Sequence, residues 1–232
     1  MLLDDVHIVL LRPRWASNLG SVARAMKNFG LRRLTIVDSC IGSWVDAWRM
    51  AVHAADVLHA AVQTDDLAAA LAPARWVVGT SNDPPAGAQV LTPREVAELA
   101  RERGAPTLLF GGEINGLDPA ELLRCHAVSC IPTAPEQSSL NLAQAVCVFA
   151  AELFAAHGAS SPPPGTAAPT ADTAMLQRLE VALRELLESS AWAGASRPKN
   201  AIAALMQPFY RANLTDAEVR AWLVALNKAG QR

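Results

Sequence analysis

Short apolar runs alternate with helical patterns from the N-terminus to about residue 156, and this alternation limits the folds open to the chain. Strands are expected over residues 6–11, 33–37, 75–79, 106–110 and 127–131. Parallel strands need crossover connections, which the intervening helical stretches supply. The pattern therefore predicts an α/β fold, with a mostly parallel sheet that carries helices on both faces.

Several helix boundaries can be read from local signals. Thr92-Pro93-Arg94-Glu95 and Asp118-Pro119-Ala120-Glu121 each combine a capping box with proline at the first helical position, so each predicts a helix start. Gly30 follows a helical pattern and is expected to end the first helix.

A second domain is expected after a linker. Residues 157–171 contain four prolines and two glycines and lack large apolar side chains, so they predict a flexible linker. Beyond it, leucines recur at helical spacing, and Thr215-Asp216-Ala217-Glu218 forms another capping box. We therefore expect an α/β domain over residues 1–156 and a small domain of about three helices over 172–232.

Composition narrows the class of protein. A net charge of -2 is unlike that of a polycation that coats nucleic acid nonspecifically, and an apolar content of 51% can fill a core. The four cysteines show no paired spacing, which favours reduced and mostly buried thiols. Acidic residues Asp4 and Asp5 stand where a secretory leader would carry positive charge, and no apolar run approaches a membrane span. We expect a cytoplasmic protein with no membrane partner.

Three junctions between a strand and the next helix place polar residues or glycine directly after a buried element. These are the segments Asn18 to Arg24, Gly111 to Leu117 and Ser138 to Ala143. In an open α/β sheet, ligands bind at the carboxyl ends of strands and beside helix N-termini. The three junctions are therefore expected to form three walls of one site.

Each junction also has a plainer interpretation. Arg24 suits a phosphate, but the pair of Asn18 and Arg24 also fits a helix cap followed by a solvated side chain. Glu113 lies between glycines that allow close approach to a cofactor, yet it also fits an exposed turn. At the third junction, capping explains only one of Ser138, Ser139 and Asn141.

Several common sites are disfavoured by the sequence. Neither G-x-G-x-x-G nor a phosphate loop ending in Gly-Lys-Ser/Thr is present, so nicotinamide and nucleoside-triphosphate chemistry lose their main support. The five histidines show no paired spacing with Cys or Glu, and we expect no metal. No G-x-S-x-G turn supports a serine triad.

Taken in order, the junctions resemble the three motifs of the SpoU branch of the SPOUT RNA 2′-O-methyltransferases. The matching elements are Asn18-x-Gly20-x-x-x-Arg24, Phe110-Gly111-x-Glu113-x-x-Gly116-Leu117, and Ile131-Pro132 followed by Ser139-Leu140-Asn141. The third motif is especially similar to the TrmJ type of this family, and residues 209–219 resemble the helical tail of that type.

This resemblance implies a deep C-terminal trefoil knot, an obligate homodimer and S-adenosylmethionine as methyl donor. It places Asn18, Arg24, Glu113, Ser139 and Asn141 at the active site, with Arg24 facing the donor of the other subunit. The implied donor-binding residues are Thr80, Ser81, Gly111, Gly116, Ile131, Ser139 and Leu140. The implied RNA-binding residues are Arg12, Arg14, Arg24 and Lys27.

The function implied by the resemblance is 2′-O-methylation of RNA ribose, with tRNA or another structured RNA as partner. The expected target is the first nucleotide of the tRNA anticodon loop, position 32, as C or U. Two alternatives stay open: the same reaction on ribosomal RNA or another tRNA site, and a catalytically silent RNA-binding dimer. The silent dimer is suggested by Gly112, which stands beside Glu113 where basic residues are common in the TrmJ type.

Overall fold

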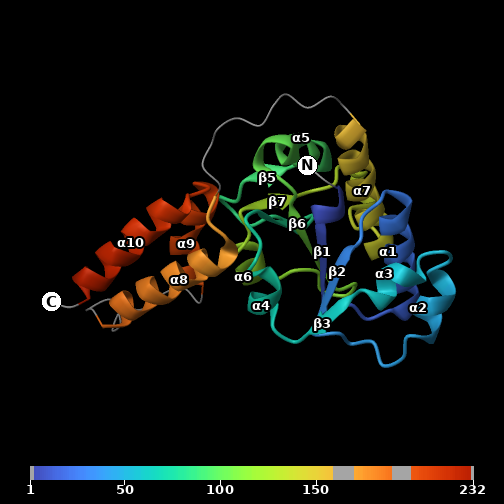
Figure 1. The fold of residues 1–232 in the computed structure, drawn as a ribbon, viewed down its shortest axis with the longest axis horizontal. Coiled ribbons are helices and arrows are strands. Elements are labelled where there is room, and N and C mark those ends of the chain that lie inside the picture. Colours follow the sequence, from blue (N-terminus) through green and yellow to red (C-terminus); the bar gives the residue numbers. More distant parts are fainter. Residues whose placement is uncertain (1–2, 159–169, 190–199, 231–232) are drawn as a thin grey trace.

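The computed structural model describes residues 3–158, 170–189 and 200–230, and its centre is a parallel sheet (Figure 1). The strand order is β3-β2-β1-β6-β4-β7-β5. The strands are β1 (His7–Leu11), β2 (Arg33–Val37), β3 (Val62–Thr64), β4 (Val77–Thr80), β5 (Val90–Leu91), β6 (Thr107–Gly111) and β7 (Ala127–Ser129). All five expected strands are confirmed, whereas β3 and β5 were not predicted.

Seven helices belong to the described part of this sheet domain. They are α1 (Ala16–Asn28), α2 (Val45–Met50), α3 (Ala55–His59), α4 (Leu67–Leu71), α5 (Pro93–Arg103), α6 (Pro119–Leu122) and α7 (Leu142–Gly158). Short 3-10 turns occur at Leu3–Asp5 and Pro135–Gln137. The expected capping boxes at Thr92 and Asp118 are both formed.

The strands bury alternate residues on opposite faces of the sheet. Ile8 and Leu10 of β1 join the larger apolar core, which also contains residues of α1, α5 and α7. Val9 and Leu11 join a second core with Leu71 at the end of α4. Both faces are therefore covered, as expected for a buried parallel sheet.

The first helix begins earlier than the sequence suggested. α1 starts at Ala16, so Asn18 lies within its first turn and is not the N-cap residue. At the other end, Phe29 is the C-cap and Gly30 has a φ of 73°, which confirms the predicted stop.

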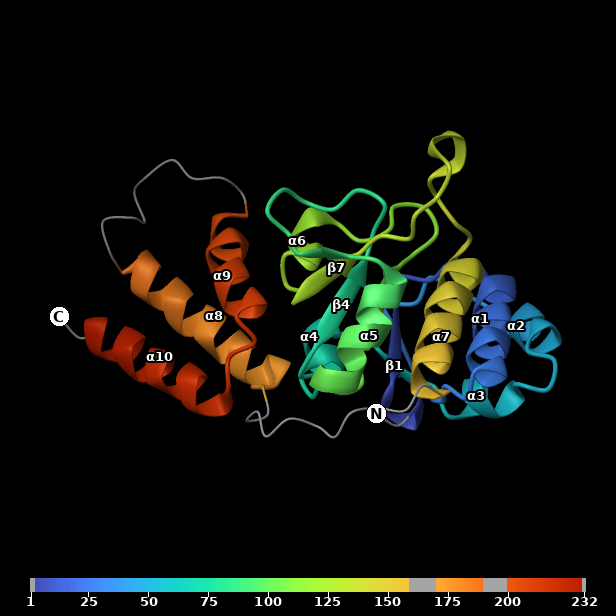
Figure 2. The same cartoon turned by 90° about the horizontal axis from the view of Figure 1, so that it is seen from above.

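The C-terminal helical unit consists of α8 (Thr173–Glu188), α9 (Ala201–Arg211) and α10 (Asp216–Ala229) around a separate apolar core. It lies beside α4 and α6 of the same chain (Figure 2). The Thr173 amide donates to the Ala74 carbonyl at 2.6 Å, and Gln207 donates to the Leu123 carbonyl at 2.6 Å. The unit is thus docked on its own sheet domain by backbone-directed hydrogen bonds.

Two expectations from the sequence need correction. The linker predicted over 157–171 is too long at both ends. Its first two residues belong to α7, and at the other end the Ala171 amide donates to the Leu214 carbonyl at 2.7 Å. Residues 159–169 lie outside the described part. All four cysteines are free, but only Cys125 is buried, so the expectation of mostly buried thiols was wrong. No helix in the described ranges is long and apolar enough to cross a membrane.

Candidate active site

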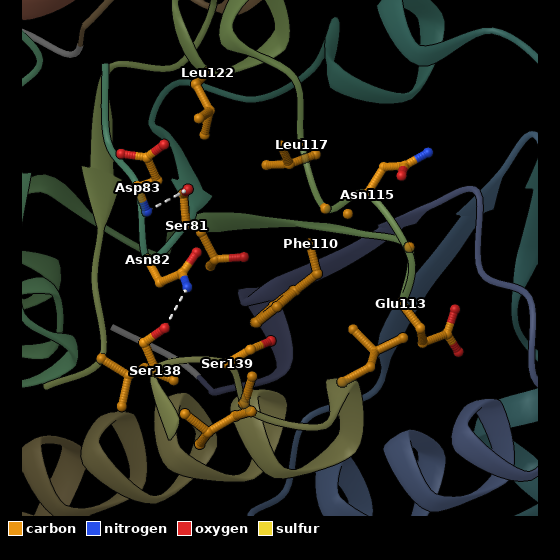
Figure 3. Close-up of a pocket in the computed structure, with 18 of the residues that line it drawn as sticks. Ser81, Asn82, Asp83, Phe110, Glu113, Asn115, Leu117, Leu122, Ser138 and Ser139 are labelled. Atoms are coloured by element: carbon orange, nitrogen blue, oxygen red, sulfur yellow. Dashed lines mark hydrogen bonds between the residues drawn. The ribbon is translucent and has the colours of Figure 1, made fainter. Parts of the chain in front are cut away.

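A cavity of about 370 Å³ opens at the carboxyl ends of β4, β6 and β7 (Figure 3). We call it the main cavity. Its apolar walls include Phe110, Leu117, Leu122 and Ile131. Ser81, Asn82 and Asp83, which follow β4, form a polar wall on the side opposite Glu113. Such a mixture of apolar walls and a few polar groups is typical of small-molecule sites.

The loop after β6 is shaped by close backbone contacts that only glycine permits. A Cβ atom at Gly111 would lie 2.0 Å from the carbonyl carbon of Gly116, and one at Gly112 would lie 2.2 Å from the Arg12 oxygen. The Gly116 amide donates to the Gly112 carbonyl at 2.9 Å, and Gly116 has a φ of 64°. The loop therefore folds back on itself and leaves its backbone at the cavity wall.

A third wall of the main cavity is formed by residues that precede α7. The Asn82 side chain donates to the Ser138 hydroxyl at 3.1 Å, which joins the segment after β4 to the segment before α7. Asn141 caps α7, since its side-chain oxygen accepts from the Ala143 amide at 2.9 Å. Ser139 and Leu140 lie between these two contacts and line the main cavity.

A chain of side-chain hydrogen bonds connects all three junctions. Asn141 Nδ2 donates to Asn18 Oδ1 at 2.9 Å, and Asn18 Nδ2 donates to Glu113 Oε1 at 3.0 Å. The Glu113 carboxylate also accepts the backbone amides of Arg14 at 2.8 Å and Trp15 at 3.2 Å. These bonds fix the start of α1 against the loop after β6 and the cap of α7.

An adjoining cavity lies along this chain of hydrogen bonds. Its lining includes Trp15, Asn18 and Asn141, and it shares Glu113, Ser139, Leu140 and Leu142 with the main cavity. A ligand in the main cavity and a second ligand in the adjoining cavity would meet near Glu113 and Ser139. This arrangement suits transfer of a group between two bound molecules.

The four basic residues expected to bind RNA have different surroundings. Arg12 donates to both oxygens of Glu121 at 2.6 and 2.9 Å, and this hydrogen bonding raises the pKa of Arg12. Lys27 pairs with Asp56 on α3. The side chains of Arg14 and Arg24 are exposed and form no ion pair within the described part of the chain. Arg14 and Arg24 are thus the two best placed to meet an external phosphate.

Arg24 is absent from the lining of both cavities. It lies on α1 six residues after Asn18, roughly 9 Å further along the helix axis. The described residues also contain no cluster of three or more His, Cys, Asp or Glu side chains that could hold a metal ion.

This combination of parallel sheet, glycine loop and three converging motifs has counterparts among known proteins. The model of the SpoU rRNA Methylase family matches residues 5–151, well over half of the chain. The chain belongs to this family. The SpoU match ends within α7, so it covers the whole sheet and all three junctions but not the helical unit.

Two curated relatives are each named tRNA (cytidine/uridine-2′-O-)-methyltransferase TrmJ. The one from Cronobacter sakazakii is 35% identical over 229 residues, covering 94% of this chain and 93% of that protein. The one from Pectobacterium atrosepticum is 41% identical over 160 residues, covering 67% of this chain and 66% of the relative. The chain thus spans slightly less than two thirds of this second relative.

A solved structure extends the similarity to the helical unit. The crystal structure of TrmJ from Z. mobilis ZM4 matches 96% of this chain and 98% of that chain, with a TM-score of 0.85 and 28% identity. The expected α/β fold of the SpoU branch is therefore confirmed.

The structure brings together most of the residues singled out in the sequence. All seven residues expected to bind the donor line the main cavity, and four of the five expected catalytic residues line the adjoining one, with Arg24 the exception. Sequence reasoning missed Asn82, Asp83 and Leu122, which belong to no matched motif. Asn82 and Asp83 could have been found from their position, because they follow a buried strand.

Proposed function

We propose that this chain is an S-adenosylmethionine-dependent methyltransferase that modifies a 2′-hydroxyl of tRNA ribose. The hydrogen-bonded chain from Asn141 through Asn18 to Glu113 carries the proposal, because it unites the three SpoU motifs beside two joined cavities. The names of the two relatives support the same reaction on tRNA.

The main cavity fits the methyl donor. Its volume falls within the roughly 300–1,000 Å³ usual for ligand pockets, and its apolar walls offer Phe110, Leu117 and Leu122 to an adenine ring. Ser81 and Asp83 supply polar groups for the sugar or the amino-acid part of the donor. When bound, S-adenosylmethionine supplies an activated methyl group on a sulfonium centre.

The adjoining cavity is proposed to receive the acceptor ribose. Ser139 and Asn141 lie where a hydroxyl could be held in line with the methyl group, which is the main geometric requirement of the transfer. Glu113 already accepts three hydrogen bonds from Arg14, Trp15 and Asn18. Glu113 is therefore proposed to act as a positioning residue that holds Asn18 and, through it, Asn141.

Arg24 is proposed to reach the site of a second copy of the chain. In its own chain Arg24 lines neither cavity, and its exposed side chain is free to bind an RNA phosphate and orient the hydroxyl. Guanidinium does not lose its proton in proteins, so the hydroxyl proton passes to a phosphate oxygen or to water. This assignment requires a homodimer, and the trefoil knot that the family resemblance implies is proposed together with it.

The proposed target is the first nucleotide of the tRNA anticodon loop, position 32, whether C or U, in the cytoplasm. The cytidine and uridine in the relatives' names support this pair of bases. Ribosomal RNA or another tRNA site is the alternative substrate. The family's name, SpoU rRNA Methylase, supports the ribosomal alternative. A silent RNA-binding dimer is less favoured, because Asn18, Glu113 and Asn141 form an intact network.

Calorimetry and labelled transfer test this proposal together. The chain should bind S-adenosylmethionine with one site per subunit and transfer labelled methyl to tRNA at a far higher rate than to ribosomal RNA. Binding without transfer to tRNA would favour the ribosomal substrate if that RNA is labelled. Absence of donor binding would favour the silent dimer and contradict the proposed activity.

A further inference from the structure

Trp15 is a large aromatic residue held in an exposed position at the adjoining cavity. The residue is 53% exposed, although hydrogen bonds hold its backbone. The Trp15 amide donates to Glu113 at 3.2 Å, and its carbonyl accepts from the Asn18 amide at 3.0 Å. The indole is therefore anchored at the N-terminus of α1 while much of its surface faces solvent.

The position of Trp15 distinguishes it from the other aromatic residues. It lines the adjoining cavity beside Asn18 and Asn141. Phe110, the other aromatic residue among those lining the two cavities, is 2% exposed and packs edge-on against Phe149. Trp15 is thus the exposed aromatic surface at this site within the described residues.

We propose that the Trp15 indole stacks on the base of the nucleotide whose ribose enters the adjoining cavity. This inference rests on the proposed function and adds the contact that holds the acceptor. Proteins that bind unpaired RNA commonly stack bases on exposed aromatic rings, and the contact contributes about 1–3 kcal/mol per base. The exposed Arg14 side chain next to Trp15 is available for the adjacent phosphate.

Stacking has a consequence for base choice. Cytosine and uracil differ in the polar groups at their edges, whereas each presents a flat face of nearly the same size to an indole. A site that holds the base by stacking accepts both pyrimidines. Stacking on Trp15 therefore fits the proposed acceptance of either C or U.

The test compares Trp15→Ala and Trp15→Phe with the wild-type chain on two tRNA transcripts, one with C and one with U at the target position. Trp15→Ala should lower kcat/KM by about 5- to 150-fold and equally for C and U, the loss that one stacking contact predicts. Trp15→Phe should recover most of this loss. The affinity for S-adenosylmethionine should change by less than about threefold, because Trp15 does not line the main cavity.

Trp48→Ala is the matched control, because Trp48 is also exposed but lies on α2 outside both cavities. Its kcat/KM should stay near the wild-type value. A direct readout uses pyrrolocytosine, a fluorescent cytosine analogue, at the target position; its fluorescence should be quenched by the wild-type chain and less so by Trp15→Ala.

Four results would overturn the inference: unchanged kcat/KM in Trp15→Ala, a loss confined to one base, a loss explained by a change of oligomeric mass, or quenching that Trp15→Ala retains. Failure of the proposed function gives a different result. In that case the wild-type chain transfers no methyl group to tRNA, while the Trp15-dependent quenching shows whether the stacking contact exists.

Discussion

The side-chain amide of Asn141 donates a 2.9 Å hydrogen bond to the side chain of Asn18, which lies 123 residues earlier in the chain. Asn18 Nδ2 in turn donates a hydrogen bond to Glu113 Oε1 at 3.0 Å. Asn18 thus has one partner on each side, and its loss would release both. The position of the side chains proposed to bind the acceptor depends on this one residue in the first turn of α1.

Replacing Asn18 tests the positioning role of this hydrogen-bonded chain. Asn18→Ala leaves the Asn141 amide without its partner and should lower kcat by about 100-fold, because small misplacements of reacting groups are that costly. Donor affinity should change little, since Asn18 lines only the adjoining cavity. Single-turnover kinetics and calorimetry measure the two effects, with Asn28→Ala on the same helix as the control. Equal losses in donor affinity and rate would contradict a role confined to the acceptor.

Gly111 provides a test of the loop that forms the main cavity. Gly111→Ala would place a Cβ atom 2.0 Å from the backbone of Gly116, so the loop must move. Donor binding should weaken by more than about tenfold, because the cavity wall moves with the loop. Gly42→Ala is the control, since a Cβ atom at Gly42 meets nothing within 4 Å. Unchanged donor affinity in Gly111→Ala would show that this loop does not hold the donor.

The proposed contribution of Arg24 to the site of a second copy can be tested by mixing two impaired chains at a donor concentration too low to load Gly111→Ala. Arg24→Ala retains its main cavity, whereas Gly111→Ala retains Arg24. If Arg24 acts on the partner's donor, random mixing restores about a quarter of the wild-type sites, because half of the dimers are mixed and each has one intact site. No recovery above the two separate variants would mean that Arg24 serves its own chain.

Acid sensitivity of the fold follows from two buried histidines. His7 bonds to Thr35 at 2.8 Å, and burial followed by the charge of Arg33 lowers the pKa of His7 to about 4. His126 accepts the Val77 amide at 3.0 Å, and burial followed by the charge of Arg103 lowers the pKa of His126 to about 4.

Both rings stay neutral in the fold, whereas the unfolded chain binds a proton near pH 6.5. The stability from these groups is complete above pH 6.5 and falls as the pH drops towards 4, by up to about 1.4 kcal/mol per pH unit for each ring. Urea unfolding at several pH values gives the free energy of unfolding as a function of pH. Between pH 6.5 and 4 this free energy should fall less steeply in His7→Gln than in the wild-type chain. The exposed His53→Asn should keep the wild-type slope. An unchanged slope in His7→Gln would contradict the assignment.

The sequence was most informative where local chemistry and burial agree. Long apolar runs such as Val6 to Leu11 and the capping boxes at Thr92 and Asp118 predicted strands and helix starts that the structure contains. The edge strands β3 and β5 escaped notice because they are two or three residues long and their Val62 and Val90 are half exposed. Such strands have too few buried side chains to leave a pattern.

The three motifs of the site could be predicted from the sequence, but the residues that contact them could not. Nothing in the sequence around Arg12 indicates its ion pair with Glu121, which depends on a contact across 109 residues. Trp15 was overlooked for the same reason, since folding places it at the adjoining cavity. The helical unit was expected as about three helices, but its docking on α4 and α6 depends on hydrogen bonds to carbonyl groups that any sequence would offer.

The most direct test of the account is to locate the transferred methyl group by mass spectrometry. Wild-type chain, labelled S-adenosylmethionine and tRNA transcripts should give one 2′-O-methyl group, on the ribose of the first anticodon-loop nucleotide. A transcript with 2′-deoxyribose at that nucleotide should accept no label. Label on a base, or label that persists on the deoxy transcript, would contradict the claim that the joined cavities transfer a methyl group to ribose.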